Sequence, residues 1–135
     1  MDENIRKMNI FDLKEVMRIE KISFVSKWTI DDFIYELIIN TKATYFIYKI
    51  GNSIVAYIGI WILDDEIHIS NLAVDPLFRR RGIARKLINR IIKEAYRVNI
   101  KTVSLEVRIS NINAINLYEN MDFEKNSILK DYYKV

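Results

Sequence analysis

A strand that leads directly into a long amphipathic helix dominates the middle of this 135-residue chain. Residues 67–74 have the β-branched composition of a strand, and after Asp75-Pro76 apolar residues recur every three or four positions. The apolar stripe of this helix consists of Ile83, Leu87, Ile88, Ile91, Ile92 and Ala95, while basic residues occupy its other faces. A helix with one apolar stripe has to cover a sheet or another helix, so the pattern favours an α/β fold.

The elements on either side of this unit predict the rest of the architecture. The N-terminal third has the 3.6-residue period of two amphipathic helices, around residues 13–24 and 29–38. Residues 45–50, 53–63 and 67–74, separated by short turns, predict an antiparallel meander. A strand at 103–109, a helix at 113–121 and a strand from 123 to about 133 complete the chain. We therefore expect an α/β (α+β) fold whose mixed, mostly antiparallel sheet has helices on both faces.

Length and composition limit the class of protein. The 135 residues, half of them hydrophobic, suffice for one two-layer domain, which we expect to span residues 1–135. No stretch approaches the roughly 20 uncharged apolar residues of a membrane span, and the N-terminus lacks the pattern of a secretory signal. We therefore expect a soluble, cytoplasmic protein that does not bind membranes. The chain has no cysteine, which excludes disulfides, thiolate metal sites and an acetyl-cysteine intermediate.

Positive charge is concentrated in one segment. Residues 79–101 contain nine basic residues and one acid, a net charge of +8, whereas the rest of the chain has 12 basic and 17 acidic residues, a net charge of −5. Arg79, Arg80, Arg81 and Arg85 surround the start of the helix, where cations oppose the helix dipole. Gly82 lets backbone N–H groups approach an anion at that turn. The segment therefore suggests an anion site, and a turn with solvated arginines is the alternative.

Two motifs, in order, resemble those of the Gcn5-related N-acetyltransferases. Residues 71–76, followed by Arg79 to Ala84, match this family's acetyl-CoA-binding pattern Arg/Gln-x-x-Gly-x-Gly/Ala. Leu105 to Arg108, together with residues 110–123, resembles a later motif of the RimI type, which acetylates protein N-termini such as that of a ribosomal protein. The spacing matches neither a dinucleotide-binding glycine motif nor a nucleoside triphosphate loop.

The resemblance implies where acetyl-CoA binds. The backbone of the strand end Leu72, Ala73 and Val74 would hold the pantetheine arm. The turn formed by Arg79, Arg80, Arg81, Gly82, Ile83 and Ala84 would hold the pyrophosphate, and Arg80, Arg81 or Arg85 would hold the 3′-phosphate. Asn111, a candidate N-cap of the last helix, would also contact the pantetheine.

The same resemblance implies two catalytic residues. Glu106 corresponds to the general base, which we expect to act through water, and Tyr118 corresponds to the general acid that protonates the departing thiolate. Without the resemblance, Glu106 would be read as a solvated strand residue and Tyr118 as a core tyrosine. His68 is the only histidine, and the sequence does not decide whether it takes part in proton transfer. We expect no metal site, because the acids and the histidine show no ligand spacing.

The sequence does not decide which class of amine receives the acetyl group. We expect acetylation of a protein or peptide N-terminus, such as that of a ribosomal protein. A small-molecule amine or lysine acetyltransferase is the alternative, and a non-catalytic module that binds CoA or nucleic acid is less favoured. RimI-type proteins carry one more strand beside the Glu106 strand, and we expect that strand to be shortened or missing here. We therefore expect either a monomer or a strand-exchanged dimer.

Overall fold

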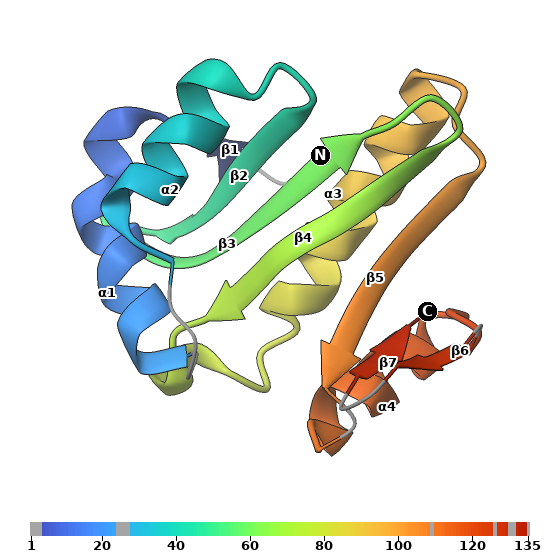
Figure 1. Ribbon diagram of the computed structural model, residues 1–135. Coiled ribbons are helices and arrows are strands. Elements are labelled where there is room, and N and C mark those ends of the chain that lie inside the picture. The colour runs from blue at the N-terminus through green and yellow to red at the C-terminus, as the bar shows by residue number, and fades with distance from the viewer. Residues whose placement is uncertain (1–3, 24–27, 109, 126, 130–131, 135) are drawn as a thin grey trace.

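A single mixed sheet organises the computed structural model, which describes residues 4–23, 28–108, 110–125, 127–129 and 132–134. The sheet has the order β1-β2-β3-β4-β5-β7-β6 (Figure 1). The strands are β1 (Ile5–Lys7), β2 (Ala43–Ile50), β3 (Ser53–Ile62), β4 (Glu66–Val74), β5 (Thr102–Arg108), β6 (Ser127–Leu129) and β7 (Tyr132–Lys134). Within the described residues, only β4 and β5 are parallel, and the other neighbouring strands pair antiparallel. The predicted mixed, mostly antiparallel sheet is confirmed.

Helices cover both faces of the sheet, as predicted. They are α1 (Leu13–Ser23), α2 (Ile30–Ile34), α3 (Ile83–Arg97) and α4 (Ile112–Asn120), with 3-10 turns η1 (Ile10–Asp12) and η3 (Pro76–Phe78). A π-helical turn, η2 (Tyr35–Ile39), continues α2. Helices α1 and α2 pack on one face, while α3 packs on the other (Figure 1). No helix in the described part of the chain is long and apolar enough to cross a bilayer.

The two faces bury separate apolar cores. The predicted stripe of α3 is buried, with Leu87, Ile88 and Ile91 fully covered against the sheet and α4. The other core joins α1 and α2 to the sheet and contains Val16, Ile19 and Phe33, each fully buried. Alternate residues of β2, β3 and β4 therefore mostly point into one core or the other.

The sheet opens where the parallel pairing of β4 and β5 ends. The β4 and β5 strands pair from Glu66↔Thr102 to Ile69↔Leu105, and beyond this point β5 pairs with β7 instead. The two strands diverge toward the ends at which they finish (Figure 1). A bulge lies at the same level, because Gly59 pairs with Asn71 and Ile60 with Ile69, so Ser70 is the extra residue. A bulge bends its strand and increases its twist, which helps β4 turn away from β5.

The C-terminal segment differs in detail from the prediction of one strand over residues 123–133. It forms two short antiparallel strands, β6 and β7, and β7 pairs with β5 through Glu106↔Lys134, Val107↔Tyr133 and Arg108↔Tyr132. The strand beside β5, which carries Glu106, is thus shortened, as expected, but the chain itself supplies it as β7. The vacancy that motivated a strand-exchanged dimer is therefore absent at Glu106, Val107 and Arg108.

Candidate active site

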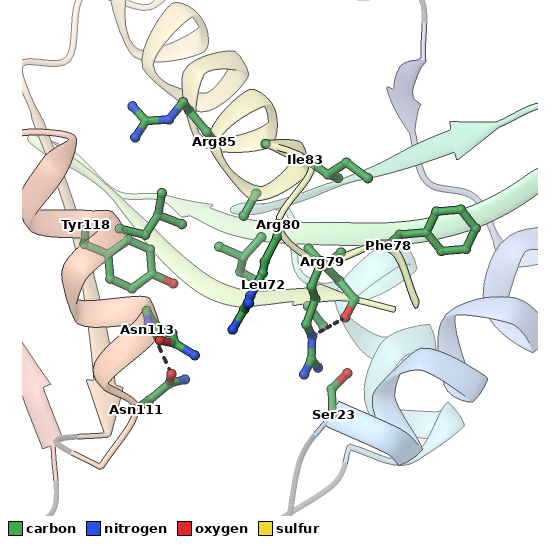
Figure 2. Close-up of a pocket in the computed structure, with 16 residues that line it drawn as sticks. Ser23, Leu72, Phe78, Arg79, Arg80, Ile83, Arg85, Asn111, Asn113 and Tyr118 are labelled. Carbon is green, nitrogen blue, oxygen red and sulfur yellow. Dashed lines mark hydrogen bonds between the residues drawn. The ribbon is translucent and has the colours of Figure 1, made fainter. Parts of the chain in front are cut away.

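A cavity of about 560 Å³ lies where β4 and β5 separate. The end of β4, the loop before α3, the first turn of α3 and one side of α4 form its walls (Figure 2). The lining contains ten of the eleven predicted cofactor-binding residues, namely Leu72, Ala73, Val74, Arg79, Arg80, Gly82, Ile83, Ala84, Arg85 and Asn111. The structure therefore gathers most of the predicted site, from three separate parts of the sequence, around one cavity.

The turn before α3 adopts a left-handed backbone. Gly82, the N-cap of α3, has φ 77° and ψ 13°, and Arg80 has φ 65°. An added Cβ at Gly82 would meet no heavy atom within 4 Å, so backbone conformation rather than crowding explains the glycine. The Gly82 cap supplies no side chain to the helix, and the first N–H groups of α3 have no intrahelical partners. These N–H groups and the helix dipole favour an anion at this wall of the cavity.

Hydrogen bonds hold the loop between β4 and α3 in place. The Asp75 carboxylate accepts from the Leu77 N–H at 3.0 Å and from the Arg18 guanidinium at 2.9 Å. Burial alone would raise the pKa of Asp75, but these two hydrogen bonds and the charge of Arg18 outweigh it and hold the pKa below its usual value. The Arg79 Nε–H donates to the Val74 carbonyl at 3.1 Å. The loop is therefore fixed at its start to both α1 and β4.

The arginines differ in their placement. Arg79 and Arg80 extend into the space between Tyr118 and Ser23 (Figure 2). Arg81 is the one predicted cofactor residue outside the lining, because its guanidinium stacks on the Phe78 ring, 5.0 Å from the ring centroid. The cavity itself is thus lined by Arg79, Arg80 and Arg85.

Tyr118 enters the cavity from α4. Its hydroxyl points toward the middle of the space (Figure 2), while its ring packs edge-on against Phe123, with centroids 6.0 Å apart. The residue is 8% exposed, and burial raises the pKa of Tyr118 to about 12. The phenol therefore keeps its proton throughout the physiological pH range and can act as a hydrogen-bond donor inside the cavity.

Three polar residues, Asn111, Asn113 and Ser23, also line the cavity. Asn111 caps α4 as predicted, because its side-chain oxygen accepts from the Ala114 N–H at 3.2 Å. Asn113 and Ser23 line the cavity but were not predicted as site residues. The buried Ser23 hydroxyl has no hydrogen-bond partner within the described residues. Asn113 lies in the first turn of α4, two residues after the predicted cap Asn111. Nothing near Ser23 in the sequence indicated contact with a segment some 50 residues away.

Glu106 lies apart from this cavity. Its neighbours Leu105 and Val107 point into the α3-side core, so Glu106 points to the opposite face, which carries α1 and α2. Its side chain is exposed, and the residue pairs with Lys134 of β7. The two predicted catalytic residues thus approach the gap between β4 and β5 from different sides.

A polar network lies on the same face as Glu106. The buried Glu36 carboxylate of η2 accepts from the Trp61 Nε1–H at 2.6 Å and from the Asn40 amide at 2.7 Å. The Tyr45 hydroxyl lies 3.0 Å from both Glu36 Oε1 and Asn71 Oδ1. The network ties η2 to β2, β3 and β4. The network could not be predicted from the sequence, because its members come from separate elements. The described residues contain no group of three metal-ligating side chains.

Comparisons with known proteins identify the family of this arrangement. The family model described as "Acetyltransferase (GNAT) family" matches residues 13–123. The [ribosomal protein bS18]-alanine N-acetyltransferase of Salmonella typhimurium is 34% identical over 125 residues, which cover 90% of this chain and 81% of that protein. The crystal structure of the Escherichia coli ribosomal-protein-S18-alanine N-acetyltransferase matches with a TM-score of 0.84 at 26% identity, covering 96% of this chain and 87% of that chain. The PaiA N-acetyltransferase of Thermoplasma acidophilum, crystallised in complex with coenzyme A, shares the fold, with a TM-score of 0.88, 15% identity and coverage of 99% and 97%.

Proposed function

We propose that this chain moves an acetyl group from acetyl-CoA directly to a protein N-terminal amine. The chain belongs to the acetyltransferase (GNAT) family and is an N-acetyltransferase of the RimI type. The observation that carries the proposal is the cavity at the separation of β4 and β5, with an anion-binding turn on one side and a buried tyrosine on the other. Members of the family use acetyl-CoA, and this cavity has features that suit its two ends. The absence of cysteine is consistent with direct transfer.

The binding of acetyl-CoA follows from the walls of the cavity. The pyrophosphate would accept hydrogen bonds from the first N–H groups of α3 and lie near Arg79 and Arg80. The 3′-phosphate would lie near Arg80, Arg81 or Arg85. The pantetheine arm would pair with the backbone of β4 from Leu72 to Val74, which β5 leaves unpaired after the strands diverge. Asn111 would contact the arm from α4.

The chemistry uses one residue on each side of the gap. Glu106, through a water molecule, accepts a proton from the acceptor ammonium, and the neutral amine attacks the thioester carbonyl carbon. A C–N bond forms, the C–S bond then breaks, and sulfur leaves with its electron pair. Tyr118 donates a hydrogen bond or its proton to the departing thiolate, and the nitrogen releases its second proton. The overall reaction yields an amide, CoA and one proton.

The acceptor is proposed from the relatives. The relatives from Salmonella typhimurium and Escherichia coli are named alanine N-acetyltransferases of ribosomal protein S18. Glu106 and Glu36 both lie on the sheet face that carries α1 and α2, and the exposed Glu106 carboxylate suits a cationic amine there. We propose that the acceptor is a ribosomal-protein N-terminus beginning with Ala or Ser. A small-molecule amine or a lysine side chain is the competing acceptor class.

Mass spectrometry after incubation with acetyl-CoA tests donor and acceptor together. The acceptor panel contains peptides with free N-terminal Ala or Ser, the same peptides with a blocked N-terminus and one internal lysine, and polyamines. We expect a 42 Da gain on the free peptides only. Acetylation of blocked peptides would instead indicate a lysine acetyltransferase. Turnover of polyamines without turnover of any peptide would contradict the N-terminal proposal while leaving the enzyme class intact.

A further inference from the structure

A second concave region lies along the outer side of α3. It is a groove of about 760 Å³, lined by α3 and by Ile5 of the edge strand β1. Four basic side chains and one acidic one line it, namely Lys86, Arg90, Lys93, Arg97 and Glu94. None of these five lines the active-site cavity. In the sequence the basic residues of α3 are spread over its polar faces, and the structure brings four of them together in one groove.

The four cations form a row along the helix. Their spacing, at positions i, i+4, i+7 and i+11, places all of them on one side of α3. The row from Lys86 to Arg97 is about 16.5 Å long, because each helical residue adds about 1.5 Å. Like charges three or four residues apart on a helix repel each other, and Glu94 is the only acid of α3. A ligand with several negative charges along its length would remove this repulsion.

Aromatic rings of β2 support two of the cations. The Arg90 guanidinium lies over the Phe46 ring, 4.9 Å from the ring centroid. Lys86 Nζ lies 5.8 Å from the centroid of the Tyr48 ring and 3.3 Å from its hydroxyl oxygen. The rings attract the cations without neutralising their charge. The groove therefore keeps its positive charge while the side chains that carry it are held.

The single acid of the groove orders two of the arginines. Glu94 accepts from Arg90 Nε at 3.3 Å and from Arg97 Nε and Nη2 at 3.1 and 2.8 Å. Within the described residues, no hydrogen bond uses the two terminal amino groups of Arg90, which suit a phosphate. Side chains that are already ordered lose less entropy when a ligand binds. The groove thus has the properties of an anion site and differs from a helix face of mobile, solvated lysines.

An exposed aromatic ring lies beside the row. Tyr96 of α3 is 81% exposed, so its ring belongs to neither core. It follows Lys93 by three residues, which makes the two side chains neighbours on the helix surface. Bases of single-stranded nucleic acids stack on such rings while a cationic groove follows their phosphates. An acidic peptide would need only the cations, so Tyr96 favours a nucleic acid.

We propose that this groove binds the phosphodiester backbone of a single-stranded nucleic acid, with one base stacked on Tyr96. Lys86, Arg90, Lys93 and Arg97 contact successive phosphates along the row. Backbone contacts carry no sequence information, so the affinity depends on salt and little on base sequence. The inference goes beyond acetyl transfer and does not depend on which amine is the acceptor.

Fluorescence anisotropy with a labelled oligouridylate of about 12 nucleotides tests the groove. Saturating CoA is present in every titration, so that the anion-binding turn before α3 does not bind the oligonucleotide. We expect a Kd of about 1 to 100 μM at physiological salt, and a slope of log K against log salt of about −2 for three phosphate contacts. An oligothymidylate of the same length distinguishes the sources of the backbone. Equal binding of both oligomers assigns the groove to either nucleic acid, and tighter binding of oligouridylate assigns it to RNA. No binding of either oligomer would overturn the proposal.

Two variants of equal net charge locate the site. Lys86→Gln/Lys93→Gln removes two cations from the row, and Lys14→Gln/Lys21→Gln removes two exposed cations from α1. The first variant should weaken binding about 10-fold and reduce the magnitude of the salt slope by about 1.4, whereas the second should change the Kd less than about twofold. Circular dichroism and Tm verify that both variants fold. Equal losses in the two variants would refute the groove as the site.

Two further measurements separate a nucleic acid from a protein partner. Tyr96→Ala should weaken binding at least about fivefold without changing the salt slope, because base stacking involves no phosphate. An unchanged Kd would refute the stacked base. Unlabelled polyglutamate should compete less well than unlabelled oligouridylate, and the reverse order would assign the groove to an acidic protein and overturn the proposal. Failure of the wild type to acetylate any amine would refute the proposed function and leave this inference intact.

Discussion

Replacing Tyr118 with Phe isolates the contribution of one hydroxyl group. The ring sits between α4 and the α3-side core, packs edge-on against Phe123, and is 8% exposed. Phenylalanine keeps this packing. The hydroxyl points into the cavity, so its removal breaks no contact that stabilises the fold (Figure 2). We expect the Tm of Tyr118→Phe to stay within about 3 °C of wild type.

The size of the catalytic effect follows from the proton affinity of the phenol. Burial raises the pKa of Tyr118 to about 12, whereas an ordinary thiol has a pKa near 8.5. In this environment, complete proton transfer to the leaving thiolate would cost about 5 kcal/mol. Donation of a hydrogen bond to the thiolate instead stabilises it by about 1.5 to 3 kcal/mol. We therefore expect Tyr118→Phe to lower kcat about 10- to 150-fold.

A thiol-specific reagent measures the release of CoA, and the absence of cysteine means that the protein itself gives no background. Acetyl-CoA binding, measured by calorimetry, should change less than threefold, because the effect belongs to the departing thiolate. A loss of kcat below threefold would refute a role for the hydroxyl. A loss above about 1000-fold would refute the hydrogen-bond argument, because it would mean that Tyr118 transfers its proton completely.

Three further predictions follow from other parts of the structure. In a peptide assay, Glu106→Gln should lower kcat/KM about 100-fold at pH 7 and less at pH 9, because an α-amino group is already neutral at pH 9. Equal losses at both pH values would count against a general base. Gly59→Ala should lower the Tm by about 10 °C in a thermal melt, because the new Cβ would overlap the buried Tyr45 ring, whereas Gly51→Ala meets no neighbour and should cost only the strain of its positive φ. Burial raises the pKa values of Tyr45 and Tyr57, so above about pH 10 these phenols ionise only in the unfolded state. Urea titrations should therefore show the free energy of unfolding falling from that pH upward, and a flat profile to about pH 12 would contradict this.

Much of the fold could be predicted because its signals are local. The α3 stripe and the β2–β4 meander have clear periods over enough residues to exclude alternatives. The β1 strand was missed because three residues are too few to show a period. The β6 and β7 strands were merged because no glycine or proline separates them. Local patterns therefore identify long elements and fail on short ones.

The residues of the candidate site show the same difference between local and distant signals. The α3 turn could be predicted because its glycine and arginines are contiguous, and ten residues of the predicted site do line one cavity. The hydrogen bonds that join Ser104 of β5 to His68 and Glu66 of β4 could not, because Ser104 lies 36 and 38 residues from these partners and meets them only through strand pairing. A shift of β5 by one residue would turn Ser104 to the α3 face and leave His68 without its partner. The register that buries Leu105 and Val107 is thus the same register that brings Ser104 to His68, so the apolar residues of β5 determine a polar contact on the opposite face of the sheet.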